Sequence, residues 1–462
     1  MRCLHLLSSA LAAAASLATA SLLPNIIFKD VVVVGGGASG AYAAVRLRDD
    51  FGKTVGLIEK QSIILLAPTG WYGRLLCRPQ DRDPPGPRGQ DFFIDAGNAT
   101  GFFDRFGIAR GNSCNPQVTT EYVDFRTGNV VNMQLLPFAD QFAAIAQFLE
   151  VVEPWEHLML PGYYDFPQPD AIPEDLLITF GDFITKHGLE DAVPLIYEST
   201  GLGLRNMTRE TTLFVLQSFG PSMAREMLGK QGMFVPASGR NQDLWRTPHG
   251  VFLTVKNSKT GQITLITARR LLLAIEPTKD DMAPFDLDDN ERTVLSKFTY
   301  TNEYTGLVNN SAFATNYSYF NLLAAAAPDH YLTLPDGSFT VRIDYLGGNN
   351  MFRVTIVGEE TLDSAGAKEL VQKDFDTLRK AGRLLDAKEG EKVSWVDFSA
   401  HGRPMHARVS VADLKDGFYQ KLYALQGGRS TWWTGGAFSV NFQTTLWQYD
   451  ELLFPEILKG LN

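Results

Sequence analysis

The spacing of hydrophobic positions changes several times along the chain, and each change predicts an element. An unbroken apolar run in FKDVVVVG, residues 28–35, predicts a strand that is buried on both faces. The segment AYAAVRLRDDFG predicts a helix that ends at Gly52, and KTVGLIEK predicts a second strand. A strand, a helix and a strand in this order are typical of a parallel sheet covered by helices.

Later segments combine helical and strand spacing. FADQFAAIAQFLEVVE and PEDLLITFGDFITKHG have helical patterns, the second with Pro173 at its start. Residues 250–275 predict a hairpin followed by another buried strand. TVRIDYLG and MFRVTIVG predict further strands, and LVQKDFDTLRKAGRLL predicts an amphipathic helix. Residues 61–94 show neither spacing and are rich in Pro, Gly, Arg and Asp, which is typical of an exposed loop or insertion.

Length and charge limit the classes of protein to consider. With 462 residues the chain is expected to form two domains, or one large domain with insertions. A formal net charge of −10 disfavours nucleic acid as a partner, because an acidic protein repels phosphate backbones. Beyond the N-terminal segment no run of about 20 apolar residues predicts a membrane span. The histidines lack an H-E-x-x-H spacing, so no metal is expected.

The first twenty residues predict a signal peptide. Arg2 precedes an Ala-rich apolar stretch, and Ala18-Thr19-Ala20 places small residues at the positions that a signal peptidase reads. Cleavage after Ala20 and a secretory route are therefore expected; a short buried helix or an uncleaved anchor is the alternative. Four sequons fit a secreted glycoprotein, and they begin at Asn98, Asn206, Asn309 and Asn316.

Three glycines follow the first strand in the spacing G-x-G-x-x-G. Gly35 allows a tight turn, Gly37 lets the backbone approach a pyrophosphate, and Gly40 allows close packing of helix on strand. The helix that starts there presents free N–H groups to the phosphates. Glu59, at the end of the second strand, can accept hydrogen bonds from a ribose hydroxyl. The predicted nucleotide-binding residues are Gly35, Gly37, Ala38, Ser39, Gly40, Glu59 and Lys60.

The motif alone permits FAD or NAD. A secreted enzyme meets little NAD outside the cell, whereas FAD can be bound during folding and carried along. ARRLLLAIEP, residues 268–277, also favours FAD, because two-domain flavoproteins return to the nucleotide domain through such a strand. An ordinary core strand is the alternative interpretation of that segment.

These segments, together with PASGRNQDLW and the ending YALQGGRSTWWTGGAFSVNFQTTLWQYDELL, resemble the FAD-dependent amine-oxidase and phytoene-desaturase superfamily. The match is closest to its fungal branch typified by β-cyclopiazonate dehydrogenase. The resemblance implies FAD held by the first β-α-β unit, with its flavin ring covered by the C-terminal block. It also implies that Gly435, Gly436 and Ala437 open a last helix whose N-terminus faces the flavin end of the cofactor.

The resemblance implies an α/β fold, α+β overall, in which a Rossmann-like FAD-binding domain carries an inserted mixed α+β substrate domain. The FAD-binding domain would comprise residues 28–100, 231–285 and 425–462. The substrate domain would comprise a helical part, 101–230, and a part with sheet and helix, 286–424. Two segments depart from the family pattern: residues 60–95 lack its short Gly-Gly segment, and residues 240–252 lack a helix and a strand. Divergence and an error in the gene prediction each explain such departures.

The implied activity is removal of a hydride from a C–N or C–C bond of a small organic substrate, an amine or a secondary metabolite, with O2 reoxidising the flavin. His401 and His406 are candidate acid–base residues, and ordinary surface or core histidines are the alternative. Trp433 is a candidate for stacking on the flavin or the substrate, with core packing as the alternative. An NAD-dependent dehydrogenase and a flavin-binding protein without turnover are the alternatives for the whole chain.

Overall fold

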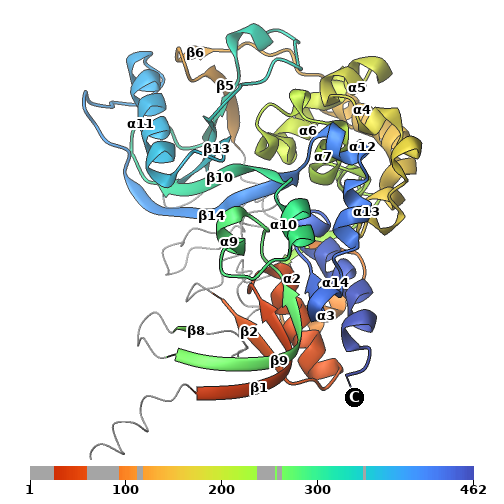
Figure 1. Ribbon diagram of the computed structural model, residues 1–462. Helices are drawn as coiled ribbons and strands as arrows, with labels where there is room; N and C mark the ends of the chain where they lie inside the picture. The colour runs from red at the N-terminus through yellow and green to blue at the C-terminus, as the bar shows by residue number, and fades with distance from the viewer. Residues whose placement is uncertain are drawn as a thin grey trace, which may run out of the picture.

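The computed structural model describes residues 25–59, 93–111, 118–236, 255–256, 263–346 and 350–461. Figure 1 shows a small sheet near the two ends of the described chain and a larger sheet farther from them, with helices beside both. The predicted signal peptide, Lys60 and most of the two departing segments lie outside the described residues. Secretion therefore stays a prediction. No helix in the described part of the chain is long and apolar enough to cross a membrane.

The small sheet is built from strands that lie far apart in the sequence. Its main order is β15-β9-β1-β2, and these strands run parallel. The apolar run of β1 is buried throughout residues 31–34, because β2 lies on one side of it and β9 on the other. The strand bounds are β1 Asn25–Val34, β2 Val55–Ile58, β9 Ile263–Leu273 and β15 Thr431–Trp433. The predicted parallel sheet is confirmed.

β9 is one continuous strand of 11 residues, where the sequence predicted the second half of a hairpin and then a separate strand. The short β8 (Val255–Lys256) pairs antiparallel with Ile263 and Thr264, and β9 pairs parallel with β1 on its other side from Thr264 onward. The hairpin and the buried strand thus share one element, because nothing between residues 263 and 273 interrupts the extended backbone.

Two helices from opposite ends of the chain pack together beside the small sheet. α2 (Ala38–Val45) continues as one π-helical turn to Asp50, and α14 (Gln443–Leu458) lies against it. The Tyr42 ring stacks on Trp447 at a centroid distance of 5.2 Å. Glu451 accepts a hydrogen bond from the Tyr42 hydroxyl and forms an ion pair with Arg46. The C-terminus of the chain is thereby attached to the first β-α-β unit.

The larger sheet has seven strands in the order β14-β10-β13-β12-β11-β5-β6, antiparallel except for the pair β11 and β5. α11 (Ser364–Lys380) covers one face through Ala367, Val371 and Phe375, as the amphipathic pattern predicted (Figure 1). The bounds are β5 Thr119–Asp124, β6 Asn129–Val130, β10 Thr299–Val308, β11 Tyr317–Asn321, β12 Phe339–Tyr345, β13 Phe352–Glu359 and β14 Trp395–Arg408.

A cluster of helices lies beside the larger sheet, on the side away from α11 (Figure 1). Its bounds are α4 Phe138–Val152, α5 Phe180–His187, α6 Val193–Ser199, α7 Thr212–Ser218 and α8 Pro221–Met227. The helix predicted to start at Pro173 starts later: a 3-10 turn covers Glu174–Leu176, and α5 begins at Phe180. The reason is Thr179, whose hydroxyl caps the helix by accepting the N–H of Asp182.

Shorter elements complete the described chain. The helix bounds are α3 Ala99–Arg105, α9 Lys279–Met282, α10 Asp289–Leu295, α12 Val411–Lys415 and α13 Phe418–Tyr423. A third sheet, of three short strands, contains β3 Phe93–Ile94, β7 Met233–Pro236 and β4 Arg110–Gly111. The parallel sheet with helices beside it and the larger mixed sheet agree with the predicted α/β class, α+β overall.

The sequon at Asn206 is not usable in this fold. The Asn206 side chain is buried, and its Nδ2 donates to the Leu334 carbonyl at 3.2 Å and to Asp336 at 2.9 Å. A glycan would be attached through this same nitrogen. The asparagines of the other three sequons are exposed.

Replacing Trp447 tests the attachment of α14 to α2. Trp447→Ala removes a side chain that is 2% exposed, and it is expected to lower the free energy of unfolding by about 3–5 kcal/mol. Leu452→Ala, on the same helix but 47% exposed, is the control and is expected to stay within about 0.5 kcal/mol of the parent. Urea unfolding followed by circular dichroism measures both. Equally small effects of both substitutions on the free energy of unfolding would show that α14 does not stabilise the first β-α-β unit.

Candidate cofactor site

The glycine turn is fixed by contact with the end of β9. A Cβ on Gly35 would lie 2.4 Å from the Ala274 carbonyl oxygen, and the residue has a φ of +99°. A Cβ on Gly40 would lie 2.0 Å from the Gly35 carbonyl oxygen and 3.0 Å from the Ala274 Cβ. Both positions therefore require glycine for the packing of β1, α2 and β9. Ala274, the residue after β9, was not predicted to belong to this turn.

Gly37 differs from Gly35 and Gly40 because no contact within the protein requires a glycine at this position. A Cβ there would meet no atom within 4 Å, and its φ of −70° is ordinary. The residue is the N-cap of α2, and no side chain caps that helix end. Close by, the Ser39 hydroxyl is buried without a hydrogen-bond partner. Open space, uncapped N–H groups and an unsatisfied hydroxyl together fit a phosphate group.

Glu59 lies beside the same turn, directly after β2. The Gly36 N–H donates a hydrogen bond of 2.7 Å to Oε2 of Glu59, and the Gly35 N–H donates to the Ile58 carbonyl at 2.8 Å. These contacts hold the carboxylate at the rim of the glycine turn. The structure thus brings together the described members of the predicted nucleotide set around one helix N-terminus, with the carboxylate where a ribose can reach it.

The C-terminal block meets the end of β9 from the other side. β15 pairs with β9, and the Thr434 N–H donates to the Leu273 carbonyl at 2.9 Å. The following Gly435 has a φ of +108°, and a Cβ on it would again meet no atom within 4 Å. Two glycine turns with open space thus flank the last residues of β9.

The prediction that Gly435, Gly436 and Ala437 open the last helix is wrong. Gly436 begins a 3-10 turn of three residues, and α14 begins only at Gln443. Gly435 has a positive φ, and a Cβ on Gly436 would lie 1.9 Å from the side-chain oxygen of Asn441. The chain therefore makes a tight reversal here and does not start a helix. The N–H groups at this turn face Glu276, whose carboxylate they help to keep charged. Glu276 is a site residue that motif reasoning missed.

Asp450 supports this turn from α14. Its carboxylate is fully buried, and the Thr434 hydroxyl donates to it at 2.6 Å. Burial raises the pKa of Asp450 well above its ordinary value. This hydrogen bond fixes the start of the turn to α14.

The catalytic candidates lie elsewhere. His406 is buried at an irregularity of β14, between the pairings Thr301 with Met405 and Thr299 with Arg408, and has a φ of +54°. Burial, with the charge of Arg408, lowers the pKa of His406 to about 3, so the ring is neutral near pH 7. The backbone of His401 belongs to β14, but its side chain is not among those that the structure describes.

Trp433 is 1% exposed and stacks on Phe438 at a centroid distance of 5.9 Å. It belongs to the core of the C-terminal block, so its core-packing interpretation fits better than stacking on a substrate.

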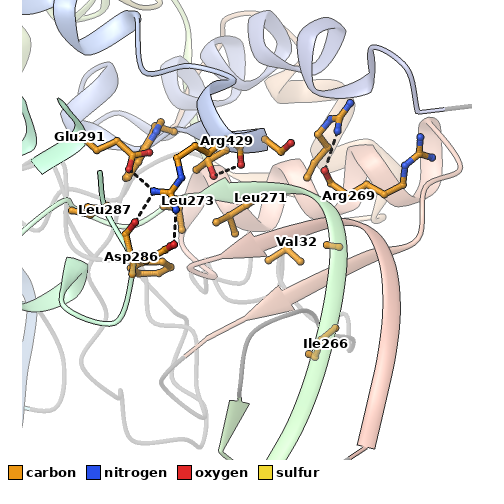
Figure 2. Close-up of a pocket in the computed structure, with 15 residues that line it drawn as sticks. Val32, Ile266, Arg269, Leu271, Leu273, Asp286, Leu287, Glu291 and Arg429 are labelled. Carbon is orange, nitrogen blue, oxygen red and sulfur yellow. Dashed lines mark hydrogen bonds and ion pairs between the residues drawn. The ribbon is translucent and has the colours of Figure 1, made fainter. Parts of the chain in front are cut away.

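A cavity of about 300 Å³ adjoins β9 and Trp433 (Figure 2). Across it, Arg429 forms ion pairs with Glu291 at 3.1 Å and with Asp286 at 2.5 Å. Arg429 and Ser430 both have positive φ values, so this strained turn is held by its contacts. The pairs fix the chain directly before β15. The residues that line this cavity include none of the nucleotide-turn residues.

A second cavity, of about 810 Å³, begins directly after Glu276. α9 and α10 line one side, and β10 of the larger sheet contributes Tyr300 and Asn302. The Tyr300 hydroxyl is buried without a hydrogen-bond partner. A cavity of this volume is in the range of small-molecule sites. Its walls come from α9 and α10 on one side and from the larger sheet on the other.

Comparisons with known proteins define the class. A family model described as an NAD(P)-binding Rossmann-like domain matches residues 33–66. Three solved structures share the fold: a CLA-producing fatty acid isomerase from P. acnes (TM-score 0.62, 15% identity, 93% of this chain and 98% of that chain), a putrescine oxidase double mutant (0.57, 12%, 94% and 100%) and cyclohexylamine oxidase from Brevibacterium oxydans (0.56, 14%, 94% and 99%). The fold and the nucleotide turn thus define a Rossmann-type nucleotide-binding protein that shares its fold with these solved structures.

Sequence relatives give the particular family. The chain is 30% identical over 462 residues to the FAD-dependent oxidoreductase pigF of Monascus ruber, covering 95% of this chain and 93% of that protein. It is 28% identical over 460 residues to β-cyclopiazonate dehydrogenase of Aspergillus flavus, covering 96% of each. The chain belongs to this family of fungal FAD-dependent oxidoreductases. The predicted family, enzyme class and FAD cofactor are confirmed, and these relatives do not support the NAD-dependent alternative.

The residues present fit FAD. The uncapped N-terminus of α2 and Ser39 would hold the pyrophosphate, and Glu59 would accept the adenosine ribose hydroxyls. The open space at Gly435 would receive the flavin end. When bound, FAD supplies the hydride acceptor that the protein side chains lack.

Two glycine substitutions separate cofactor contact from packing. Gly37→Ala has room for its methyl group and is expected to change the free energy of unfolding by less than about 1 kcal/mol. It fills the space over the helix N-terminus and is expected to weaken FAD binding at least about tenfold. Gly40→Ala is expected to destabilise the fold itself by about 1–3 kcal/mol, because its methyl group meets the backbone.

Thermal unfolding and quenching of FAD fluorescence measure the two effects. If the Gly37→Ala protein binds FAD as tightly as the parent does, the pyrophosphate does not lie at this turn.

Proposed function

We propose that the protein removes a hydride from a C–N or C–C bond of a small organic substrate, an amine or a secondary metabolite. The observation that carries this proposal is the meeting of two open glycine turns at the end of β9, beside a cavity that extends into the second sheet. The full-length relationship to a protein named β-cyclopiazonate dehydrogenase supports a dehydrogenation. The amine oxidases among the solved structures of this fold support a carbon–nitrogen bond as a target.

The 810 Å³ cavity is the proposed substrate site. Apolar side chains such as Met282 and Phe298 line it together with the charged Lys279, Asp280 and Glu360. A substrate with a flat apolar body and a polar edge fits such a lining. The unsatisfied Tyr300 hydroxyl would supply one orienting hydrogen bond. Burial and nearby carboxylates raise the pKa of Tyr300 well above its ordinary value, so it acts as a neutral donor.

The protein's own contribution is binding and exclusion of water, since hydride transfer needs no covalent nucleophile. His406 lines neither described cavity, and its neutral, buried ring suits a structural role at the irregular part of β14.

We propose that O2 reoxidises the reduced cofactor, as the resemblance to amine oxidases implies. We also propose that the protein acts on the secretory route that its first twenty residues predict.

An absorption spectrum of the purified protein is the first test. Oxidised-flavin bands are expected, and loss of the bands from the protein on denaturation would identify a non-covalent cofactor. Anaerobic addition of amines and of secondary metabolites, in separate trials, is expected to bleach the bands with at least one donor. Admission of air is expected to restore them. Bound flavin that no donor bleaches would contradict the proposed turnover.

A Tyr300→Phe protein is the matched variant for the substrate site. It is expected to bind FAD normally and to require a higher concentration of the bleaching donor, by about fivefold to tenfold for one lost hydrogen bond. An unchanged donor concentration would place the substrate outside this cavity.

A further inference from the structure

Glu276 occupies the flavin end of the cofactor site in the free protein. It follows β9 by three residues, and a Cβ on Gly436 would lie 2.8 Å from its Oε1 atom. Its second oxygen, Oε2, is buried without a hydrogen-bond partner. The N–H groups of Gly436 and Ala437 act on the carboxylate and favour its charged form. A carboxylate therefore lies against the same N–H groups that the fold offers to the cofactor.

The other groups around Glu276 oppose its charge. Burial and the carboxylate of Asp281, on α9, raise the pKa of Glu276 to about 7 against the two N–H groups. From β10, the phenol of Tyr300 also faces it, and the charge of Glu276 helps to raise the pKa of that phenol. No lysine or arginine is among the groups that shift this carboxyl in the described part of the chain. Glu276 is thus balanced between its charged and neutral forms near neutral pH.

We propose that Glu276 controls FAD binding: its charged form competes with the cofactor for the N–H groups of Gly436 and Ala437, and FAD binds to the protein with Glu276 protonated. The inference rests on the proposed position of FAD between the two glycine turns. The physical reason is that these N–H groups cannot donate to the flavin end of FAD while they donate to Glu276, and that a charged carboxylate beside the site repels the anionic cofactor. The proton comes from solvent, and no bond other than O–H is formed.

The affinity for FAD is expected to depend on pH in a defined direction. At about pH 6 Glu276 is mostly neutral in the free protein, so binding carries no protonation cost. Above about pH 7 each further pH unit is expected to weaken binding by up to about tenfold, because one proton must be taken up per FAD. Between about pH 6 and about pH 8.5 the dissociation constant is therefore expected to rise at least about tenfold.

Two measurements test this on the full chain stripped of cofactor and then titrated with FAD. Flavin fluorescence quenching gives the dissociation constant across the pH range. Calorimetry at about pH 8 in two buffers of different ionisation enthalpy gives the number of protons taken up, expected to be near one per FAD. The second measurement uses the parent protein alone, so it does not depend on a variant that folds.

Glu276→Gln is the variant, because the amide resembles the neutral acid. It is expected to bind FAD at about pH 8.5 at least about tenfold more tightly than the parent, with little dependence on pH. Glu226→Gln is the matched control: burial raises the pKa of Glu226 to about 7 as well, but this residue lies on α8, which packs on α4 in the helical cluster. It is expected to keep the pH dependence of the parent.

Each outcome decides between the two proposals. A parent protein with pH-independent affinity and no proton uptake would overturn the role of Glu276 and leave the cofactor assignment intact. Weaker binding in Glu276→Gln than in the parent would show that the carboxylate is a cofactor ligand and not a competitor. Absence of FAD binding by both proteins at every pH would overturn the proposed function itself, and this inference with it.

Discussion

The contact between Ala274 and the glycine turn is the constraint on which the site depends. Because Gly35 and Gly40 have no side chains, the backbone after β9 can lie directly against the start of α2. That contact holds the first β-α-β unit to a strand more than 200 positions later in the chain, and the parallel pairing of β1 with β9 extends it. β15 then joins the other side of β9 and brings the second glycine turn to the same place. A single strand end therefore positions both halves of the cofactor site.

α14 closes this arrangement by joining the two turns. Its Trp447 donates a hydrogen bond to the Ala38 carbonyl in the first turn of α2, at 3.2 Å, and its Asp450 accepts a hydrogen bond from Thr434 beside Gly435. A shift of α14 would move both turns at once. The aromatic contacts of Trp447 with Tyr42 and Phe102 make such a shift costly, since large buried rings contribute most to packing.

Local spacing predicted the parts of the molecule that local physics controls. The valine run of β1, the glycine spacing and the pattern of α11 each follow from neighbours in sequence, and the structure has them as expected. The start of α14 and the role of Glu276 depend on partners far along the chain. Residues 435–437 contain two glycines that fit a helix N-terminus in sequence terms, but contact with Asn441 and Glu276 turns the chain back instead. Trp433 is in the core because β15 pairs with β9, which its own spacing does not reveal.

An acidic protein that binds a dianionic cofactor needs a source of positive potential, and here backbone N–H groups provide it. The guanidinium of Arg46, on the helix that begins at the glycine turn, is already paired with Asp50 and Glu451. N–H dipoles are weaker than cations, so the state of nearby carboxyls decides whether an anion is held. Burial raises the pKa of Asp450 well above its ordinary value, and the Gly36 N–H holds Glu59 at the rim of the turn, where it would face ribose hydroxyls and not phosphate. Glu276 is the carboxyl of this set whose charge changes near neutral pH, and it lies on the N–H groups themselves.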